Sequence, residues 1–210
     1  MSRCGDVYEN KVTGEHALVL RGSEDRGDGP AVVYLTLRPG GAVVGEHTHP
    51  TIVEKFTLVK GRLEAKIAGK TMTLTPGQSV TAQPTVPHDW WNASPNEDAH
   101  ILIEIDAAPG TPRDRGDRFE QMIGTLFGLA NDGKVDRKGR PNPLQGVLIA
   151  REFADVVAFT HPPAWVQSVM TTLLAPIATM LGYKAIYPHY LGPHGHVTPG
   201  AEILAASGLA

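Results

Sequence analysis

The sequence predicts a mainly β domain, built as a sandwich or barrel of antiparallel hairpins and followed by an α-helical extension. Two observations support this fold class: short β-rich runs with a period of two fill residues 15–105, and the apolar spacing becomes helical after residue 109. A chain of 210 residues is long enough for one sizeable domain with an appendage.

The β part is a succession of runs separated by turn residues. Glycine or proline lies between successive runs, as at Pro39-Gly40-Gly41, Gly61 and Pro76-Gly77, which is typical of antiparallel hairpins. In chain order the runs are EHALVL, AVVYLTL, EKFTLVKG, RLEAKIAG, KTMTLT, QSVTA, HDWWNA and AHILIEI.

Three helices are expected in the extension. The first carries an apolar stripe from Phe119 to Ala130 and ends at Gly133, and the second runs from about Pro143 to Thr160. The third begins at HPPAW and keeps its apolar period to Leu181. We therefore divide the chain into a β-barrel domain at 15–108, a helical extension at 109–188 and a loose C-terminal tail at 189–210.

Composition and charge narrow the class of function. Hydrophobic residues make up 41% of the chain and charged residues 20%, as in an ordinary globular protein, and a net charge of -3 gives no basic surface for nucleic acid. Cys4 is the only cysteine, so no intrachain disulfide can form. The first residues lack the basic start and apolar run of a secretion signal, and we expect a cytoplasmic location.

The stretch GEHTHPTIVEKF, residues 45–56, predicts a metal site. Side chains alternate on a strand, so His47 and His49 point to the same side, about 6.6 Å apart at Cα. If the following run returns as a hairpin, Glu54 lies opposite this pair. Two imidazoles and a carboxylate suit a divalent transition metal with open coordination positions.

A later run supplies a fourth candidate ligand. His88 begins HDWWNA, and Trp90 and Asn92 share its face. Phe56 and Leu58 follow Glu54 on the same face of their strand. We expect these four neighbours to be inward-facing pocket residues, with Phe56 and Trp90 more simply explained as barrel core.

These residues carry a resemblance to the cupin family. Gly41-x5-His47-x-His49-x4-Glu54-x6-Gly61 matches the first cupin motif at every defined position. The second motif is met by Gly69, Pro76, His88 and Asn92, but Gln83, Pro84 and Thr85 stand where Pro-x-Gly is usual. The resemblance implies a double-stranded β-helix, or jelly roll, with His47, His49, Glu54 and His88 as metal ligands.

The resemblance also implies a function. We expect one iron, manganese, nickel or zinc ion and an enzyme acting on a small organic molecule, with dioxygenase-type oxidation favoured and Glu54 as a candidate catalytic base. A metal-dependent isomerase or cyclase and a non-catalytic binding module remain alternatives. An inward-facing Tyr34 or Glu104 would favour catalysis over binding.

The third helix raises the question of partners. Residues 156–183 contain no Lys, Arg, Asp or Glu, but polar residues such as Gln167 and Thr171 argue against a membrane span. We favour an apolar stripe that covers the barrel or a partner subunit over one that lies in a membrane surface. Cupins often pair through their sheets, so the resemblance implies a homodimer.

Overall fold

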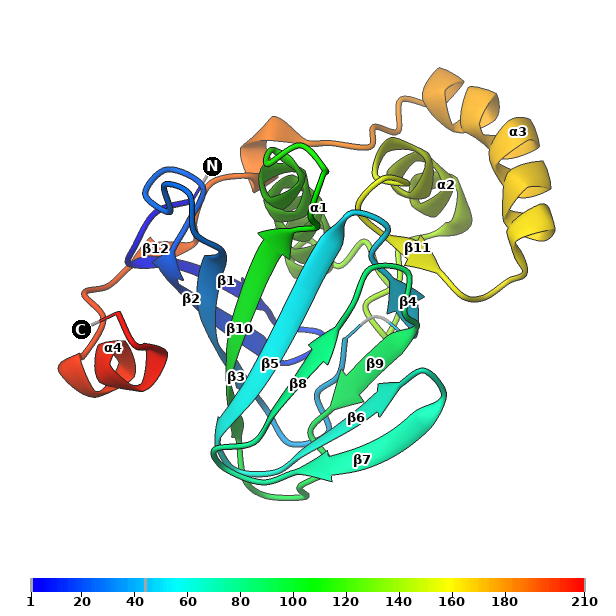
Figure 1. The fold of residues 1–210 in the computed structure, drawn as a ribbon. Coiled ribbons are helices and arrows are strands. Elements are labelled where there is room, and N and C mark those ends of the chain that lie inside the picture. The colour runs from blue at the N-terminus through cyan, green and yellow to red at the C-terminus, as the bar shows by residue number, and fades with distance from the viewer. Residues whose placement is uncertain (1, 44, 210) are drawn as a thin grey trace.

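The barrel consists of two antiparallel sheets, which face each other in a computed structural model that describes residues 2–43 and 45–209 (Figure 1). The larger sheet has the order β12 (Gly195–His196), β1 (Asp6–Asn10), β2 (Glu15–Arg21), β3 (Ala31–Leu37), β10 (Ala99–Ala107), β5 (Ile52–Lys60) and β8 (Ser79–Ala82). The smaller sheet has the order β11 (Ala158–Phe159), β4 (His47–Thr48), β9 (His88–Trp91), β6 (Leu63–Ile67) and β7 (Lys70–Leu74). The predicted mainly β jelly roll is confirmed.

Alternating burial explains why these runs form strands. Along β5, every second residue from Ile52 to Leu58 is buried, so one face of the strand packs into the barrel. Gly61 ends this strand with a φ of +87°, and a Cβ at that position would lie 2.5 Å from the carbonyl oxygen of Asp98. Both its conformation and the close backbone approach therefore require glycine.

The main core lies between the two sheets. Phe56, Leu58, Leu63, Ala65 and Ile101 are fully buried there. A second apolar cluster covers the outer face of the larger sheet, where Leu18, Val32 and Leu102 pack against Ile203 and Leu204 of the C-terminal helix α4 (Ala201–Ser207). The tail predicted to be loose is thus helical in part, and its β12 pairs with β1.

The larger sheet also extends before residue 15, where we placed the start of the β-barrel domain. Strand β1 begins at Asp6 and pairs with β2, so the sheet includes residues that the period-two pattern did not identify. Its sequence, DVYEN, is too short and too polar to give a clear alternation.

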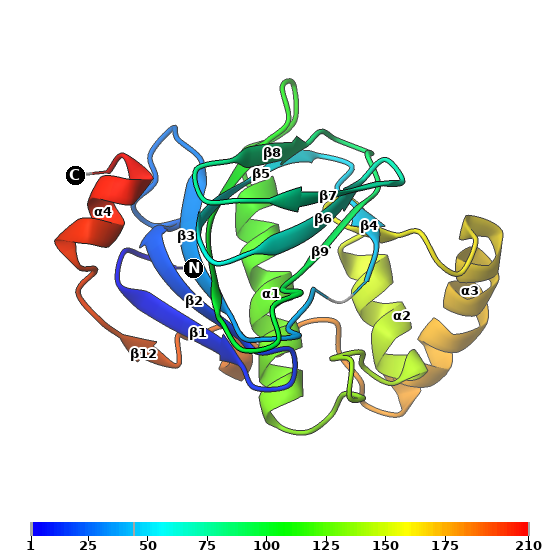
Figure 2. The same ribbon diagram turned by 90° about the horizontal axis from the view of Figure 1, so that it is seen from below.

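The extension contains α1 (Arg115–Asn131), α2 (Pro143–Glu152), α3 (Ala164–Met180) and the short 3-10 helix η1 (Pro188–Tyr190). Helix α1 contacts β1 and β10, and it covers one end of the barrel (Figures 1 and 2). The second helix was predicted to reach Thr160, but α2 ends at Glu152. Phe153, Val156 and Val157 are buried in tight turns, whose i, i+3 spacing imitates a helix.

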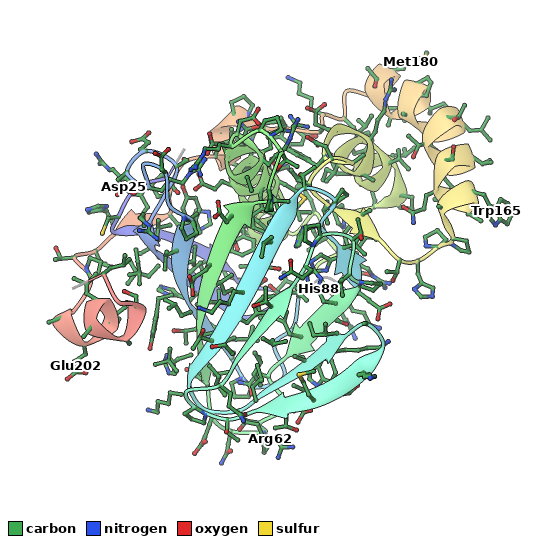
Figure 3. The ribbon with its side chains drawn as sticks, in the orientation of Figure 1. Asp25, Arg62, His88, Trp165, Met180 and Glu202 are labelled. Carbon is green, nitrogen blue, oxygen red and sulfur yellow. The ribbon has the colours of Figure 1, made fainter. Side chains whose placement is uncertain are left out.

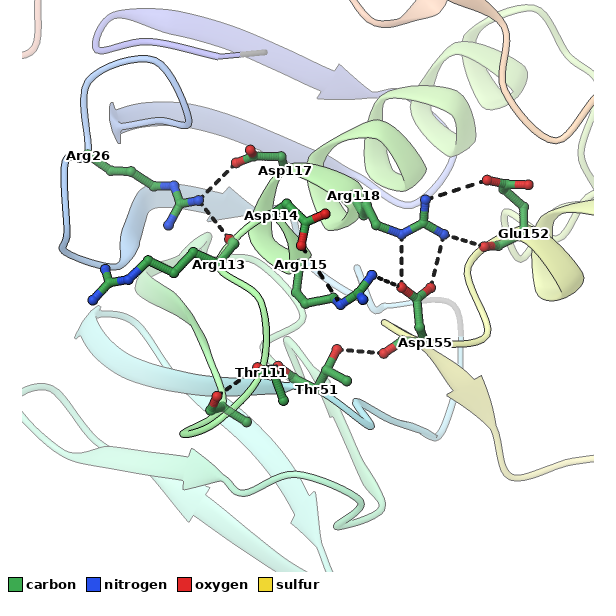
Figure 4. Close-up of polar contacts among 11 residues, drawn as sticks. Arg26, Thr51, Thr111, Arg113, Asp114, Arg115, Asp117, Arg118, Glu152 and Asp155 are labelled. Carbon is green, nitrogen blue, oxygen red and sulfur yellow. Dashed lines mark hydrogen bonds and ion pairs between the residues drawn. The ribbon is translucent and has the colours of Figure 1, made fainter.

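A network of charges fixes the start of α1 against the segment after α2 (Figure 4). Arg118 Nε and Nη2 donate to the two carboxylate oxygens of Asp155 at 2.9 and 3.0 Å, and Arg115 pairs with the same carboxylate. Arg26 pairs with Asp117 at 3.0 Å on the other side of the helix. Because planar guanidinium groups bind carboxylates at two points, this network fixes both position and orientation.

Helix α3 packs on α2. Ala175 and Ala178 are buried against Val147 and Leu148, with Met170 and Leu174 beside them. The opposite side of α3 is apolar and exposed, and Figure 3 shows Trp165 and Met180 pointing away from α2. This exposed α3 stripe comprises Trp165, Val169, Leu173, Ile177, Met180 and Leu181. In the described part of the chain, no helix has the length and hydropathy needed to cross a membrane.

Candidate metal centre

The two sheets contribute different members of the predicted ligand set. His47 on β4 and His88 on β9 are direct partners in the smaller sheet, and His49 follows β4 by one residue. Glu54 lies on β5 in the larger sheet, so the predicted hairpin between the histidine pair and Glu54 is wrong. The carboxylate meets the imidazoles because the sheets face each other, not because two neighbouring strands pair.

The four side chains converge on one point. Each offers a ligand atom, and these atoms all lie within 4.8 Å of one another. Glu54 Oε2 lies 3.2 Å from His49 Nε2 and 3.2 Å from His88 Nε2. The ring centroid of His47 lies 4.9 Å from that of His49 and 4.4 Å from that of His88. The predicted cluster of His47, His49, Glu54 and His88 is therefore present.

Backbone carbonyls set the orientation of every imidazole. His47 Nδ1 lies 2.8 Å from the Gly45 oxygen, His88 Nδ1 lies 3.0 Å from the Val86 oxygen, and His49 Nδ1 lies 2.7 Å from the Val156 oxygen. A carbonyl only accepts, so each Nδ1 carries the proton and each Nε2 lone pair is left for a cation.

Burial and mutual contact control the charges in the cluster. Burial, together with the neighbouring His49 and His88, lowers the pKa of His47 to about 4, which keeps this imidazole neutral. Burial alone would raise the pKa of Glu54, but His49 and His88, when they carry a second proton at Nε2, outweigh burial and lower that pKa well below its usual range. Neutral imidazoles and an ionised carboxylate are the states that bind a metal, so the donor set fits a divalent transition ion.

The cluster faces an apolar cavity of about 160 Å³ inside the barrel. His47, Glu54 and Trp90 line one part of it, and α1 closes it with Phe119, Met122, Ile123, Leu126 and Phe127. The Phe119 ring stands edge-on to His49, with 5.3 Å between the centroids. The first helix of the extension therefore forms a wall of the site.

The predicted pocket residues have different roles. Trp90 lines the cavity, whereas Phe56 and Leu58 belong to the barrel core. Asn92 is buried, but its amide donates to the backbone oxygens of Leu37 and Glu97, so it ties the loop after β9 to the end of β3.

The two residues proposed as indicators of catalysis face away from the cavity. Tyr34 packs on the outer face of the larger sheet beside the α4 cluster, and Glu104 pairs with Lys55 at 2.7 Å.

Sequence reasoning missed a carboxyl group in the cavity. Glu15 is 8% exposed, lines the cavity and accepts a hydrogen bond of 2.5 Å from the Thr13 hydroxyl. Burial, with a smaller contribution from the charge of Glu54, raises the pKa of Glu15 to about 7 against the lowering effect of Thr13. The sequence did hold one indication that Glu15 points inward, because it shares its strand face with the apolar residues Ala17 and Val19.

Comparisons with known proteins identify the central part of the chain. A family model described as "Cupin domain" matches residues 33–105. No curated protein matches the chain.

Several solved structures are similar to part of the chain. KdgF from Halomonas sp. is 17% identical, with 46% of this chain and 84% of that chain covered and a TM-score of 0.38. A predicted oxalate decarboxylase from Thermotoga maritima is 22% identical, with 43% and 78% covered and a TM-score of 0.40. A sugar phosphate isomerase from Silicibacter pomeroyi is 21% identical, with 49% and 68% covered and a TM-score of 0.40.

Proposed function

Because residues 33–105 form a cupin domain, we propose that the protein is a metal-dependent enzyme acting on a small organic molecule. The observation that carries this proposal is the convergence of His47, His49, Glu54 and His88 beside an apolar cavity. A ligand set without an adjacent space would suit a structural metal. A cluster that opens on a cavity suits chemistry on a bound molecule.

The four side chains would hold one iron, manganese, nickel or zinc ion. Iron would supply redox chemistry with dioxygen, and any of the four would supply Lewis-acid polarisation. The chain itself orients the imidazoles through the carbonyls of Gly45, Val86 and Val156 and excludes water with the α1 wall. Glu54 would serve as a ligand or, when released from the ion, as a base.

Dioxygenase-type oxidation is the activity we favour. The cavity wall is almost entirely apolar, which suits an apolar substrate and limits the number of acid and base groups that contact it. A metal-dependent isomerase or cyclase would need proton transfer, for which Glu54 and Glu15 are the carboxyl candidates. A non-catalytic binding module is supported by the outward positions of Tyr34 and Glu104, whereas Glu15 in the cavity favours turnover.

Metal content tests the site directly. His49→Ala should reduce the bound metal well below one ion per chain, measured by elemental analysis of protein purified without an affinity tag. His16→Ala is the matched control, since His16 is exposed on β2, and it should keep the metal content of the unchanged protein. One bound metal ion per chain in His49→Ala would refute the proposed metal site.

Oxygen consumption tests the reaction. Iron-loaded protein should consume dioxygen with a catechol, a diketone or a flavonol, measured with an oxygen electrode, and the His49→Ala variant should not. No consumption across a broad panel by protein with full iron content would count against dioxygenase-type oxidation and leave the isomerase, cyclase and binding alternatives.

We also propose a homodimer, formed through the exposed α3 stripe. The helix has 17 residues, so the stripe is about 25 Å long. Residues 156–183 contain no Lys, Arg, Asp or Glu, so the partner surface needs no compensating charge. The same stripe on a second copy is such an uncharged surface. Membrane-surface contact by residues 156–183 is less well supported, because few cations flank the stripe.

Light scattering after size-exclusion chromatography tests the assembly. Leu173→Lys, in the middle of the stripe, should convert a dimer to a monomer, whereas Lys138→Ala, in the loop before α2, should not. A dimer that survives Leu173→Lys would show that the stripe is not the interface, and flotation of the protein with liposomes would identify a membrane surface instead.

The lone cysteine is consistent with our proposal of a cytoplasmic location.

A further inference from the structure

Asn10 and Glu15 form a polar pair in the wall of the mostly apolar cavity. They are direct antiparallel partners on β1 and β2, so their side chains leave the sheet on the same face, about 5 Å apart at Cβ. Both line the cavity, and they are 1% and 8% exposed. This Asn10–Glu15 pair lies outside the stretch that matches the cupin domain model.

Each member of the pair uses one polar atom within the protein and leaves another free. Asn10 Oδ1 accepts from the backbone N–H groups of Val12 and Thr13, and Glu15 Oε2 accepts from the Thr13 hydroxyl. Asn10 Nδ2 and Glu15 Oε1 have no hydrogen-bond partner among the described residues.

These two free atoms keep access to the cavity. In the described part of the chain, the polar side-chain atoms that are closed off without a partner are Arg115 Nε and Thr125 Oγ1. Asn10 Nδ2 and Glu15 Oε1 are not among them, so both atoms keep some exposed surface, and both residues line the cavity. The protein thus presents one donor and one carboxyl oxygen side by side.

The other carboxylates of the cavity are already engaged. Glu120 accepts hydrogen bonds from the backbone and hydroxyl groups of Ser2 and Ser23, through both of its oxygens. Glu54 belongs to the metal cluster. Glu15 lies on β2, which is separated from β5 by β10 and β3 in the larger sheet. A ligand that reaches the metal cluster and the Asn10–Glu15 pair would therefore touch two different parts of the wall.

The size of the cavity limits what fits between them. A cavity of about 160 Å³ is close to the ~150 Å³ apolar cavity that accepts a benzene-sized molecule. This volume matches a single ring with short substituents better than it matches several fused or linked rings. Other wall residues, such as Leu35, Val43 and Trp90, are apolar and suit a hydrocarbon ring.

We propose that the substrate is a single-ring or equally small apolar molecule with a hydroxyl group that binds between Asn10 Nδ2 and Glu15 Oε1. A hydroxyl donates one hydrogen bond and accepts others, so it can donate to Glu15 and accept from Asn10 at the same time. The assignment of one end of this molecule to the metal cluster rests on the proposed function. The binding of its hydroxyl group to the Asn10–Glu15 pair does not depend on that function. Binding without the hydroxyl leaves two buried polar groups unpaired, which is a strong basis for discrimination.

Benzyl alcohol and ethylbenzene test this assignment, because they differ only in a hydroxyl and a methyl group. Their dissociation constants are measured by calorimetry with the metal-loaded protein and with Glu15→Leu and Glu15→Gln. The ratio of the ethylbenzene constant to the benzyl alcohol constant should fall at least tenfold in Glu15→Leu, as expected for one lost hydrogen bond. Glu15→Gln can still accept a hydrogen bond and should keep most of the preference.

Three results would overturn the proposal. The first is an unchanged ratio in Glu15→Leu, and the second is a loss in Glu15→Gln as large as that in Glu15→Leu. The third is that ethylbenzene binds to the unchanged protein at least tenfold more tightly than benzyl alcohol does. This result needs no variant, so it applies even if Glu15→Leu fails to fold. Metal analysis of the same samples separates the two proposals. A hydroxyl preference that depends on Glu15 in protein that binds no metal would refute the proposed function alone.

Discussion

Replacing Glu15 by Gln should change how the stability of the protein depends on pH. The side chain keeps its size, but it can no longer ionise. In the folded protein, burial raises the pKa of Glu15 from 4.5 to about 7. Between these two values the unfolded chain has lost the proton and the folded chain still holds it, so the free energy of unfolding falls as the pH rises.

The magnitude follows from the difference between the two pKa values. Each pH unit corresponds to 1.36 kcal/mol, and the interval from 4.5 to about 7 gives about 3 kcal/mol. This contribution is fully present below pH 4.5, declines through the interval and is absent above about pH 7. The Gln variant lacks this decline. Over the same interval, the free energy of unfolding of the unchanged protein should therefore fall by about 3 kcal/mol relative to that of Glu15→Gln.

Urea unfolding of the metal-free protein, followed by circular dichroism at several pH values, measures the difference. A chelator is present throughout, so that metal binding adds no pH dependence. Glu97→Gln is the matched control, since Glu97 is exposed in the loop between β9 and β10, and its curve should parallel that of the unchanged protein. If the free energies of unfolding of Glu15→Gln and of the unchanged protein followed parallel curves from pH 4.5 to 8, Glu15 would not be a buried, protonated carboxyl group.

The other predictions concern the extension. Asp155→Asn should lower the free energy of unfolding by about 2 kcal/mol, because it removes charge-assisted hydrogen bonds to Arg115 and Arg118. These guanidinium groups lower the pKa of Asp155 against the effect of its burial, so the contribution is present at neutral pH and is lost as the pH falls below about 4. Urea titration at pH 7 and pH 3 measures both effects, and an equal loss at the two pH values would contradict the account. A chain that ends at Pro109 should expose the apolar barrel end and aggregate, as measured by light scattering, whereas a compact monomer would show that α1 is dispensable.

The sequence was informative where a residue type and a spacing coincided. The alternation along β5 and the glycine after it predicted the strand and its turn, and the histidine spacing at 47 and 49 predicted two ligands on one side. The pairing of strands was not accessible, because a period of two fixes the face of a side chain but not the neighbouring strand. For this reason Glu54 was assigned to a hairpin, although it comes from the opposite sheet.

The extension shows a second limit. Apolar residues at i, i+3 and i+4 predicted three helices, but the same pattern gave no information on which partner each helix covers. Phe153 and Val156 fit a helical stripe and are instead buried in turns. Glu15 was overlooked because a carboxylate at the start of a strand is usually exposed, and its inward position follows only from the pairing with β1 and β3.

The hydrogen bond between His49 and the carbonyl of Val156 links two parts of the chain that the domain division keeps apart. Val156 belongs to the segment between α2 and β11, which the Arg118–Asp155 contacts hold against the start of α1. An ion that favours one orientation of His49 therefore also favours the docked position of this segment, and by reciprocity the docked segment tightens the hold on the ion. The barrel and its extension would then respond together to chelation, with amide hydrogen exchange around Val156 rising as the ion is withdrawn.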